Sequence, residues 1–183
     1  DETRKIIDKN YDGYDEKQKA RRAKVKEFFS HTFKFPLYLM SHPIQGFNEF
    51  KTEKKARMSV AIFILILFVL EEIVAYKYLG PVINTNNPQK FNSLEILAFS
   101  VGPVVLLTVS NWSVTTLMDG KGKMKEIFML CCYSLFPVVM LGFLHIALSN
   151  VMIEDEKQII LVLKIISWVL TAYMAFMGLV VIH

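Results

Sequence analysis

The sequence has little cysteine, and what it has argues against a fold held together by disulfides. Its two cysteines, Cys131 and Cys132, are adjacent and lie inside an apolar run. A disulfide between neighbouring residues has unfavourable geometry, so we interpret both as small apolar helix residues. No further soft ligand is placed nearby, and the pair therefore does not indicate a metal or thiol centre.

The sequence also lacks the motifs of common enzymes and nucleotide-binding proteins. It contains no Walker loop, no Gly-x-Gly-x-x-Gly and no Gly-x-Ser-x-Gly. The histidines are His31, His42, His145 and His183, and they form neither a His-x-x-x-His nor a Glu-x-x-His pattern. We therefore expect a non-enzymatic protein with no catalytic residue, no cofactor, no metal site and no bound nucleotide.

Apolar residues are what the sequence has in abundance. They make up 53% of the 183 residues, and the mean hydropathy is +0.36. Of 21 Lys and Arg residues, those that follow Met58 are Lys77, Lys90, Lys121, Lys123, Lys125, Lys157 and Lys164. A basic polar head before long apolar runs is typical of an integral membrane protein.

Four apolar segments are long enough to cross the hydrocarbon core as helices, which takes about 20 residues each. They cover residues 58–78, 94–117, 127–149 and 159–182. The predicted fold class is therefore all-α, a polytopic bundle of transmembrane helices.

The loops orient these spans. Lys121, Lys123 and Lys125 lie between the second and third spans, and basic residues favour the cytoplasmic side. We therefore expect a multi-pass protein of the cell membrane whose N-terminal segment is cytoplasmic.

Three regions follow from this topology. Residues 1–36 form a basic cytoplasmic helical segment, 37–57 an interfacial amphipathic segment, and 58–183 the transmembrane domain. Pro36 and Pro43 make the aromatic stretch 33–50 too broken to span the membrane. The basic helix, expected over 15–29, either lies on the inner leaflet or is simply solvated. Its closeness to a span favours lipid phosphate or a protein partner over nucleic acid.

Two runs of residues carry a family resemblance. One is His42-Pro-Ile-Gln-Gly-Phe-Asn-Glu-Phe-Lys51, and the other is Asn111-Trp-Ser-Val-Thr-Thr-Leu-Met-Asp-Gly120. From about Leu37 to His183 the chain resembles bacterial members of the Yip domain family, named for Ypt/Rab-interacting proteins. The second run is the more specific part.

The resemblance implies a cytoplasmic N-terminal region and five transmembrane helices, so a fifth span is expected after His183. It also implies that no catalytic residue can be transferred. Bacterial members occur alongside ABC-type transporters, some as accessory or assembly subunits. The link of eukaryotic members to Rab GTPases is not carried over.

Ionisable residues inside the predicted spans are candidate functional groups, because burying them is costly. Glu71, Glu72 and Lys164 lie at matching depths in the outer half, with Glu95 at the mouth of the second span. They are predicted to form a polar cluster in which one glutamate pairs with Lys164. Alternatively, Lys164 extends to the headgroups and the glutamates lie in a thinned interface.

Two prolines interrupt the middle spans near the midplane. Pro103 and Pro137 are candidate helix kinks, since proline removes a backbone hydrogen bond. Broken helices at one depth can form a binding site in transporters, but a packing role is the simpler interpretation.

Polar residues at the inner end of the second span are candidate packing or partner contacts. Asn111 and Thr115 share a helix face and are expected to bond to neighbouring helices. Asp119, Lys121, Lys123 and Lys125 follow in the loop and are expected to meet lipid or a partner. In the last span Thr171, Ala175 and Gly178 predict a close approach by another helix, such as the fifth span or a partner subunit.

Two functions remain open from the sequence. The favoured one is a membrane scaffold or accessory subunit that contacts membrane lipids and other membrane proteins, with an ABC-type transporter as the candidate partner. Residues 33–50 and 121–126 are its expected contacts. The alternative is a small transporter or channel-like protein with a polar path between the proline-kinked spans.

Overall fold

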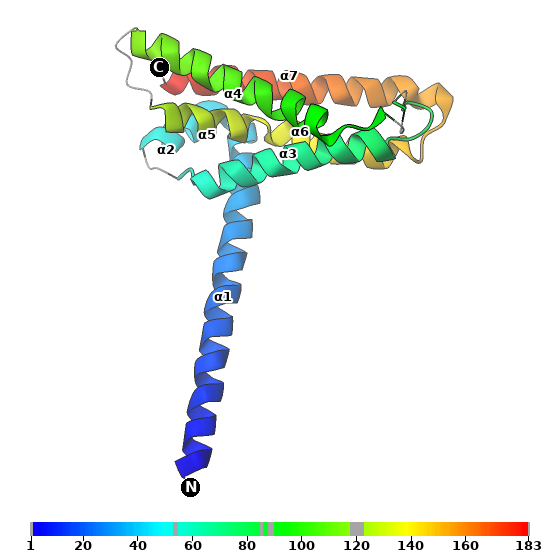
Figure 1. Cartoon of the computed structure of the whole chain (residues 1–183). Helices are drawn as coiled ribbons and strands as arrows, with labels where there is room; N and C mark the ends of the chain where they lie inside the picture. Colours follow the sequence, from blue (N-terminus) through cyan, green and yellow to red (C-terminus); the bar gives the residue numbers. More distant parts are fainter. Residues whose placement is uncertain (1, 53–54, 85, 88–89, 118–122, 183) are drawn as a thin grey trace. The chain divides into compact units, whose positions relative to one another are not determined.

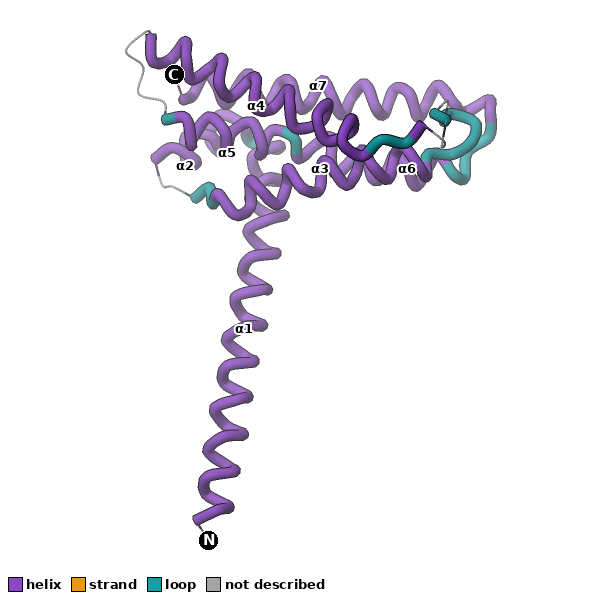
Figure 2. The backbone as a smooth tube through the Cα atoms, in the orientation of Figure 1, coloured by secondary structure: helices purple, strands orange, loops and turns teal. Residues whose placement is uncertain are grey.

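The computed structural model describes residues 2–52, 55–84, 86–87, 90–117 and 123–182. Its elements are helical and it contains no strand within these ranges, as the sequence predicts. Contacts divide the chain into two units, Asp1–Phe35 and Pro36–His183. Figures 1 and 2 show the helices of both units.

The first unit consists of helical backbone and belongs to helix α1, Glu2–Ser41. The helix is longer than the predicted 15–29, and Pro36 lies inside it. Its side chains from Gln18 to Lys26 are all exposed. A solvated or surface-bound helix has this character, because the basic side chains need water or phosphate around them.

The second unit contains four apolar helical segments that can cross a membrane. The first two are α3, Met58–Tyr78, and α4, Ser93–Leu117. The fourth is α7, Lys157–Ile182, preceded by the short helix η2, Glu154–Glu156. These bounds lie within a few residues of the predicted spans. In lipid each helix satisfies its own backbone groups, which is why long apolar runs adopt this form.

The third predicted span is two helices, α5 from Met124 to Ser134 and α6 from Phe136 to Ser149. Pro137 occupies the first turn of α6, and its ring would clash with a carbonyl one turn back in a continuous helix. The chain responds with a tighter turn, in which the Leu135 N–H donates to the Cys132 carbonyl at 3.2 Å. Pro103, by contrast, lies inside the continuous helix α4.

The third span forms the centre of the bundle. Within an apolar stretch of 18 residues, 72% of its positions are buried, against 33% in the corresponding stretch of α3, 22% in that of the fourth span and 17% in that of α4. Helix α5 packs on α3, α4 and α7, while α6 packs on α3 and α7. Helix α4 is therefore the most peripheral span, and its apolar surface is left to lipid or to another protein.

The two ends of this bundle differ (Figure 1). At one end, called the loop end, residues 79–92 and 150–156 connect the spans. At the other, called the α2 end, helix α2, Pro43–Thr52, packs on α7. A Cβ on Gly178 of α7 would lie 2.7 Å from Leu130 and 2.9 Å from Phe47. The close approach predicted at Gly178 is therefore made by α5 and by α2 of the same chain.

Candidate functional site

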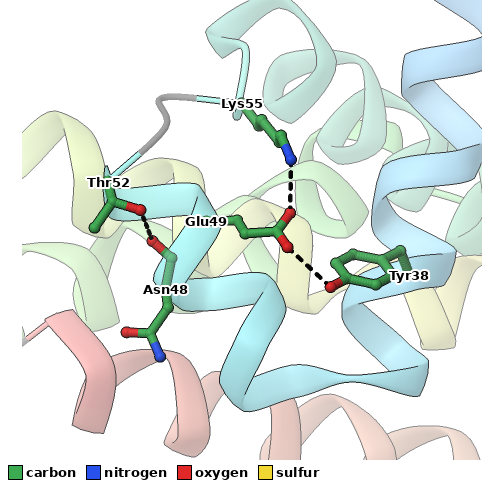
Figure 3. A network of polar contacts seen from close by, with 5 residues as sticks. All are labelled: Tyr38, Asn48, Glu49, Thr52 and Lys55. Carbon is green, nitrogen blue, oxygen red and sulfur yellow. Dashed lines mark hydrogen bonds and ion pairs between the residues drawn. The ribbon is translucent and has the colours of Figure 1, made fainter.

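A network of polar contacts holds α2 in place at the α2 end (Figure 3). The carboxylate of Glu49 accepts hydrogen bonds from the Tyr38 hydroxyl and from the Lys55 ammonium, both at 2.9 Å. The network joins the end of α1, the middle of α2 and the segment that leads into α3. We infer from this network that the run from His42 to Lys51 has a structural role: it holds Phe47, Phe50 and Lys51 in position.

The same network makes stability depend on pH. Hydrogen bonds from Lys55 and Tyr38 hold the pKa of the Glu49 carboxyl below its usual value of 4.5. A carboxyl whose pKa is depressed by folding stabilises the folded state above its unfolded pKa, and this contribution is lost as the pH falls through the folded pKa. We expect the Tm in detergent to fall more steeply below about pH 4.3 in the parent chain than in Glu49→Gln. Exposed Glu154→Gln is the matched control, and equal slopes in the parent and Glu49→Gln would contradict the role of the network.

A basic cavity of about 300 Å³ lies beside α2. The positive side chains that line it are Lys51, Lys123 and Lys125, and Glu126 is the one acidic residue of its lining. Phe50 and Met129 contribute apolar surface. The net positive charge suits a phosphate or carboxylate, because such groups pair well with lysine.

Backbone contacts fix the walls of this basic cavity. The Lys51 ammonium donates to the Val181 carbonyl at 3.2 Å, near the C-terminal end of α7, where the helix dipole favours a cation. The Glu126 carboxylate accepts from the Lys123 N–H at 3.4 Å and caps the start of α5. The two segments expected to contact partners, 33–50 and 121–126, thus each supply a residue to one cavity. Asp119 and Lys121 lie outside the described residues.

The other predicted contacts in α4 form hydrogen bonds along the helix. The Asn111 amide donates to the Leu107 carbonyl at 2.8 Å, and the Thr115 hydroxyl donates to the Asn111 carbonyl at 2.7 Å. Such bonds satisfy a polar group in lipid without a neighbouring helix. Bonding of Asn111 to a partner helix stays a prediction.

At the loop end, the four residues of the predicted polar cluster separate into two environments. No salt bridge joins any of Glu71, Glu72, Glu95 and Lys164, all of which the structure describes. Glu71 and Glu72 are neighbours on a helix and therefore point in different directions. Glu71 faces α6, and Glu72 faces α4.

Glu71 is 4% exposed and packs on Gly142 of α6. Its Oε2 has no hydrogen-bond partner among the described residues. His145 of α6 is also buried, at 4% exposed. His145 was not among the candidate residues predicted from the sequence. It lies three residues after Gly142, so the two residues share one face of α6.

Glu72 and Glu95 line one cavity of about 460 Å³ between α3, α4 and α7. Lys90, Tyr76 and Asn92 also line it, and none of them was a candidate. Besides Tyr76, the aromatic residues of its wall are Phe68, Phe99 and Trp168. Lys90 is in the loop, where no periodicity links it to α3, so the sequence gives no signal for its place here.

Comparison with known proteins identifies the chain at the level of a family. The model of the Yip1 domain matches residues 37–183. Comparisons with curated proteins and with solved structures returned no match. The match covers the whole second unit apart from Pro36, including α2 and the four candidate spans. The family is not a known enzyme family. This chain, a multi-pass membrane protein, belongs to the Yip1 domain family.

Proposed function

We propose that the chain is a non-enzymatic scaffold or accessory subunit that binds another membrane protein at the α2 end. The cell membrane is the proposed location, with the N-terminal segment in the cytoplasm. An ABC-type transporter is the proposed partner. The observation that carries the proposal is the basic cavity, to which two segments distant in the sequence, Phe50–Lys51 and Lys123–Glu126, both contribute.

The chemistry of this basic cavity indicates what kind of contact it makes. Lys123 and Lys125 are exposed, so their ammonium groups are available to an acidic segment of a partner. Phe50 and Met129 lie next to them and provide apolar area beside the charges. An acidic loop with an apolar anchor complements both features, and charge complementarity of this kind selects partners.

The peripheral position of α4 supports the same proposal. Most of its apolar side chains are exposed, among them Leu97, Leu106, Val114 and Leu117. Its small and polar residues Ser110, Ser113 and Thr116 are exposed as well. Small and polar residues favour packing between helices in lipid, so α4 offers a partner an intramembrane face.

A charge reversal tests the α2 end. A tagged chain purified in mild detergent should retain a stoichiometric partner. Lys125→Glu should reduce its recovery at least tenfold, since like charges at an interface cost more than the roughly 1.4 kcal/mol that a factor of ten represents. Lys157→Glu, an exposed lysine at the loop end, is the matched control and should leave recovery unchanged. Equal recovery in both variants, or no partner at all with the parent chain, would rule out the proposed contact.

The alternative function, a small transporter or channel-like protein, has less support from the structure than the scaffold function. Pro103 lines a cavity whose wall is mostly apolar, including Val104, Leu107 and Leu135, whereas a solute path needs polar groups. Flux through the purified chain in liposomes separates the two functions, since a scaffold alone moves no solute.

A further inference from the structure

Two adjoining cavities, one at the loop end and one deeper in the bundle, differ in polarity. The polar cavity is lined by Glu72, Glu95 and Lys90, as described above. A second, apolar cavity of about 220 Å³ continues from it between α4 and α7, over α5. The residues common to both walls are Phe68, Phe99, Ser100 and Trp168. The Phe68 and Trp168 rings meet edge to face, with centroids 6.3 Å apart, where the cavities join.

Along the membrane normal the polar cavity comes first and the apolar cavity follows it, as the headgroup and the acyl chains do in a lipid molecule. Along α4 the polar wall begins at Glu95, near the helix start, and the apolar wall extends to Leu107. At 1.5 Å per residue this stretch covers about 18 Å, a little more than half of a hydrocarbon core of roughly 30 Å. Polar groups thus lie at headgroup depth and the apolar groove follows toward the midplane.

We propose that this composite cavity binds one phospholipid with a primary ammonium headgroup, phosphatidylethanolamine. None of Glu72, Glu95 and Lys90 forms a salt bridge with another described residue. The two carboxylates accept hydrogen bonds from the lipid ammonium, and Lys90 pairs with its phosphate. Tyr76 and Trp168 add aromatic surface of the kind that attracts a cation.

The apolar cavity holds an acyl chain. Its wall includes Pro103, Leu107 and Ala172, which offer no competing charge. Among the described residues of its wall, the one buried side-chain oxygen or nitrogen without a hydrogen-bond partner is the Thr171 hydroxyl, and Thr171 is 7% exposed. An ester carbonyl of the lipid can accept the hydrogen bond of this hydroxyl. An anionic headgroup without an ammonium would face two carboxylates instead, so the site discriminates against phosphatidylglycerol.

Native mass spectrometry of the purified full chain tests the headgroup. The protein is loaded with equal amounts of phosphatidylethanolamine, phosphatidylcholine and phosphatidylglycerol, and the bound lipid is identified by mass. The parent chain should prefer phosphatidylethanolamine, and Glu72→Gln with Glu95→Gln should reduce that preference about tenfold, because the amide oxygens still accept a hydrogen bond but carry no negative charge to strengthen it. Glu154→Gln, at the same end but outside the cavity, should not. An unchanged preference in the double variant would overturn the proposal.

A second pair of variants tests the acyl chain. Ala172→Trp fills the apolar cavity and should reduce retention of all three lipids, whereas Val169→Trp, on the exposed side of the same helix, should retain them. Equal retention in both would count against the groove. Soluble phosphoethanolamine should not displace the lipid, and displacement at equal concentration would mean that a free headgroup is the ligand.

Photo-crosslinking in native membranes tests which molecule occupies the groove. A photoreactive residue at Leu107 should form adducts with phosphatidylethanolamine. Crosslinks to a protein instead would show that a partner helix fills the groove, and the lipid proposal would then be wrong.

Discussion

Replacing Gly80 with alanine should lower the free energy of unfolding by about 3 kcal/mol, at the upper end of the range for overpacked sites. A Cβ at this position would overlap the Ser149 carbonyl oxygen and lie 2.5 Å from the Ser149 carbonyl carbon. Both are backbone atoms, so no side chain can rotate away to relieve the contact. The α3–α6 junction at the loop end must open instead.

This junction has hydrogen bonds that the opening would break. The Gly80 N–H donates to the Ser149 hydroxyl at 2.9 Å, and the Asn150 amide donates to the Tyr78 carbonyl at 2.9 Å. Both fix the end of α3 on the end of α6. Their loss adds to the steric cost of the methyl group.

Thermal unfolding in detergent measures the effect. Cys131 and Cys132 are buried free thiols, so a thiol-reactive fluorophore reports unfolding directly. Gly102→Ala in α4 is the matched control, because nothing lies within 4 Å of its added Cβ. It should be neutral or stabilising by up to about 1 kcal/mol, the propensity gain of alanine over glycine in a helix. A Gly80→Ala chain as stable as Gly102→Ala would contradict the close approach.

The second large effect concerns Gly142 and Glu71, which are in direct contact inside the bundle. A Cβ on Gly142 would lie 2.6 Å from Cδ and 2.9 Å from Cγ of Glu71, and it would also overlap Oε1. Glu71 is 4% exposed, so its side chain would have to shift within the packed bundle to make room for the methyl group. Gly142→Ala should therefore destabilise the chain by about 2 kcal/mol.

A double-mutant cycle isolates this contact. Glu71→Ala removes the atoms that the new methyl group would meet, so Gly142→Ala should cost less in that background than in the parent chain. The coupling free energy should reach about 1–2 kcal/mol, within the range for residues in contact. Glu72→Ala is the control partner, because Glu72 faces the polar cavity, and it should show no coupling with Gly142→Ala. Additive effects for Glu71 and Gly142 would mean that the two do not touch.

The positions of the four spans could be predicted from the length of the apolar runs in the sequence. An apolar run of about 20 residues has no stable alternative to a helix across the bilayer, since its backbone groups find no water there. The bounds of α3 follow directly, from Met58 to Tyr78. Local geometry explains the break at Pro137, which lies in the first turn of α6, where a proline ring is tolerated. Pro103 has the same chemistry yet remains within one helix, a difference that the sequence does not reveal.

The candidate sites were less predictable. Depth along a span follows from counting residues, and so Glu71, Glu72 and Lys164 were placed at one level. The rotation of one helix against another does not follow from counting. This rotation places the Glu71 side chain against Gly142 and the Glu72 side chain in the wall of the polar cavity.

Composition and periodicity within single segments were enough to predict the helical class, the four apolar spans and the basic character of the first unit. The family resemblance came from two runs of residues, His42–Lys51 and Asn111–Gly120. The folded bundle was needed to see that α2 covers Gly178, that Lys51 lies with Lys123 and Lys125 at one cavity, and that Lys90 lies with Glu72 and Glu95. Lipid favours every apolar helix equally, so small residues, packing and close contacts between distant segments select the partners of each helix face.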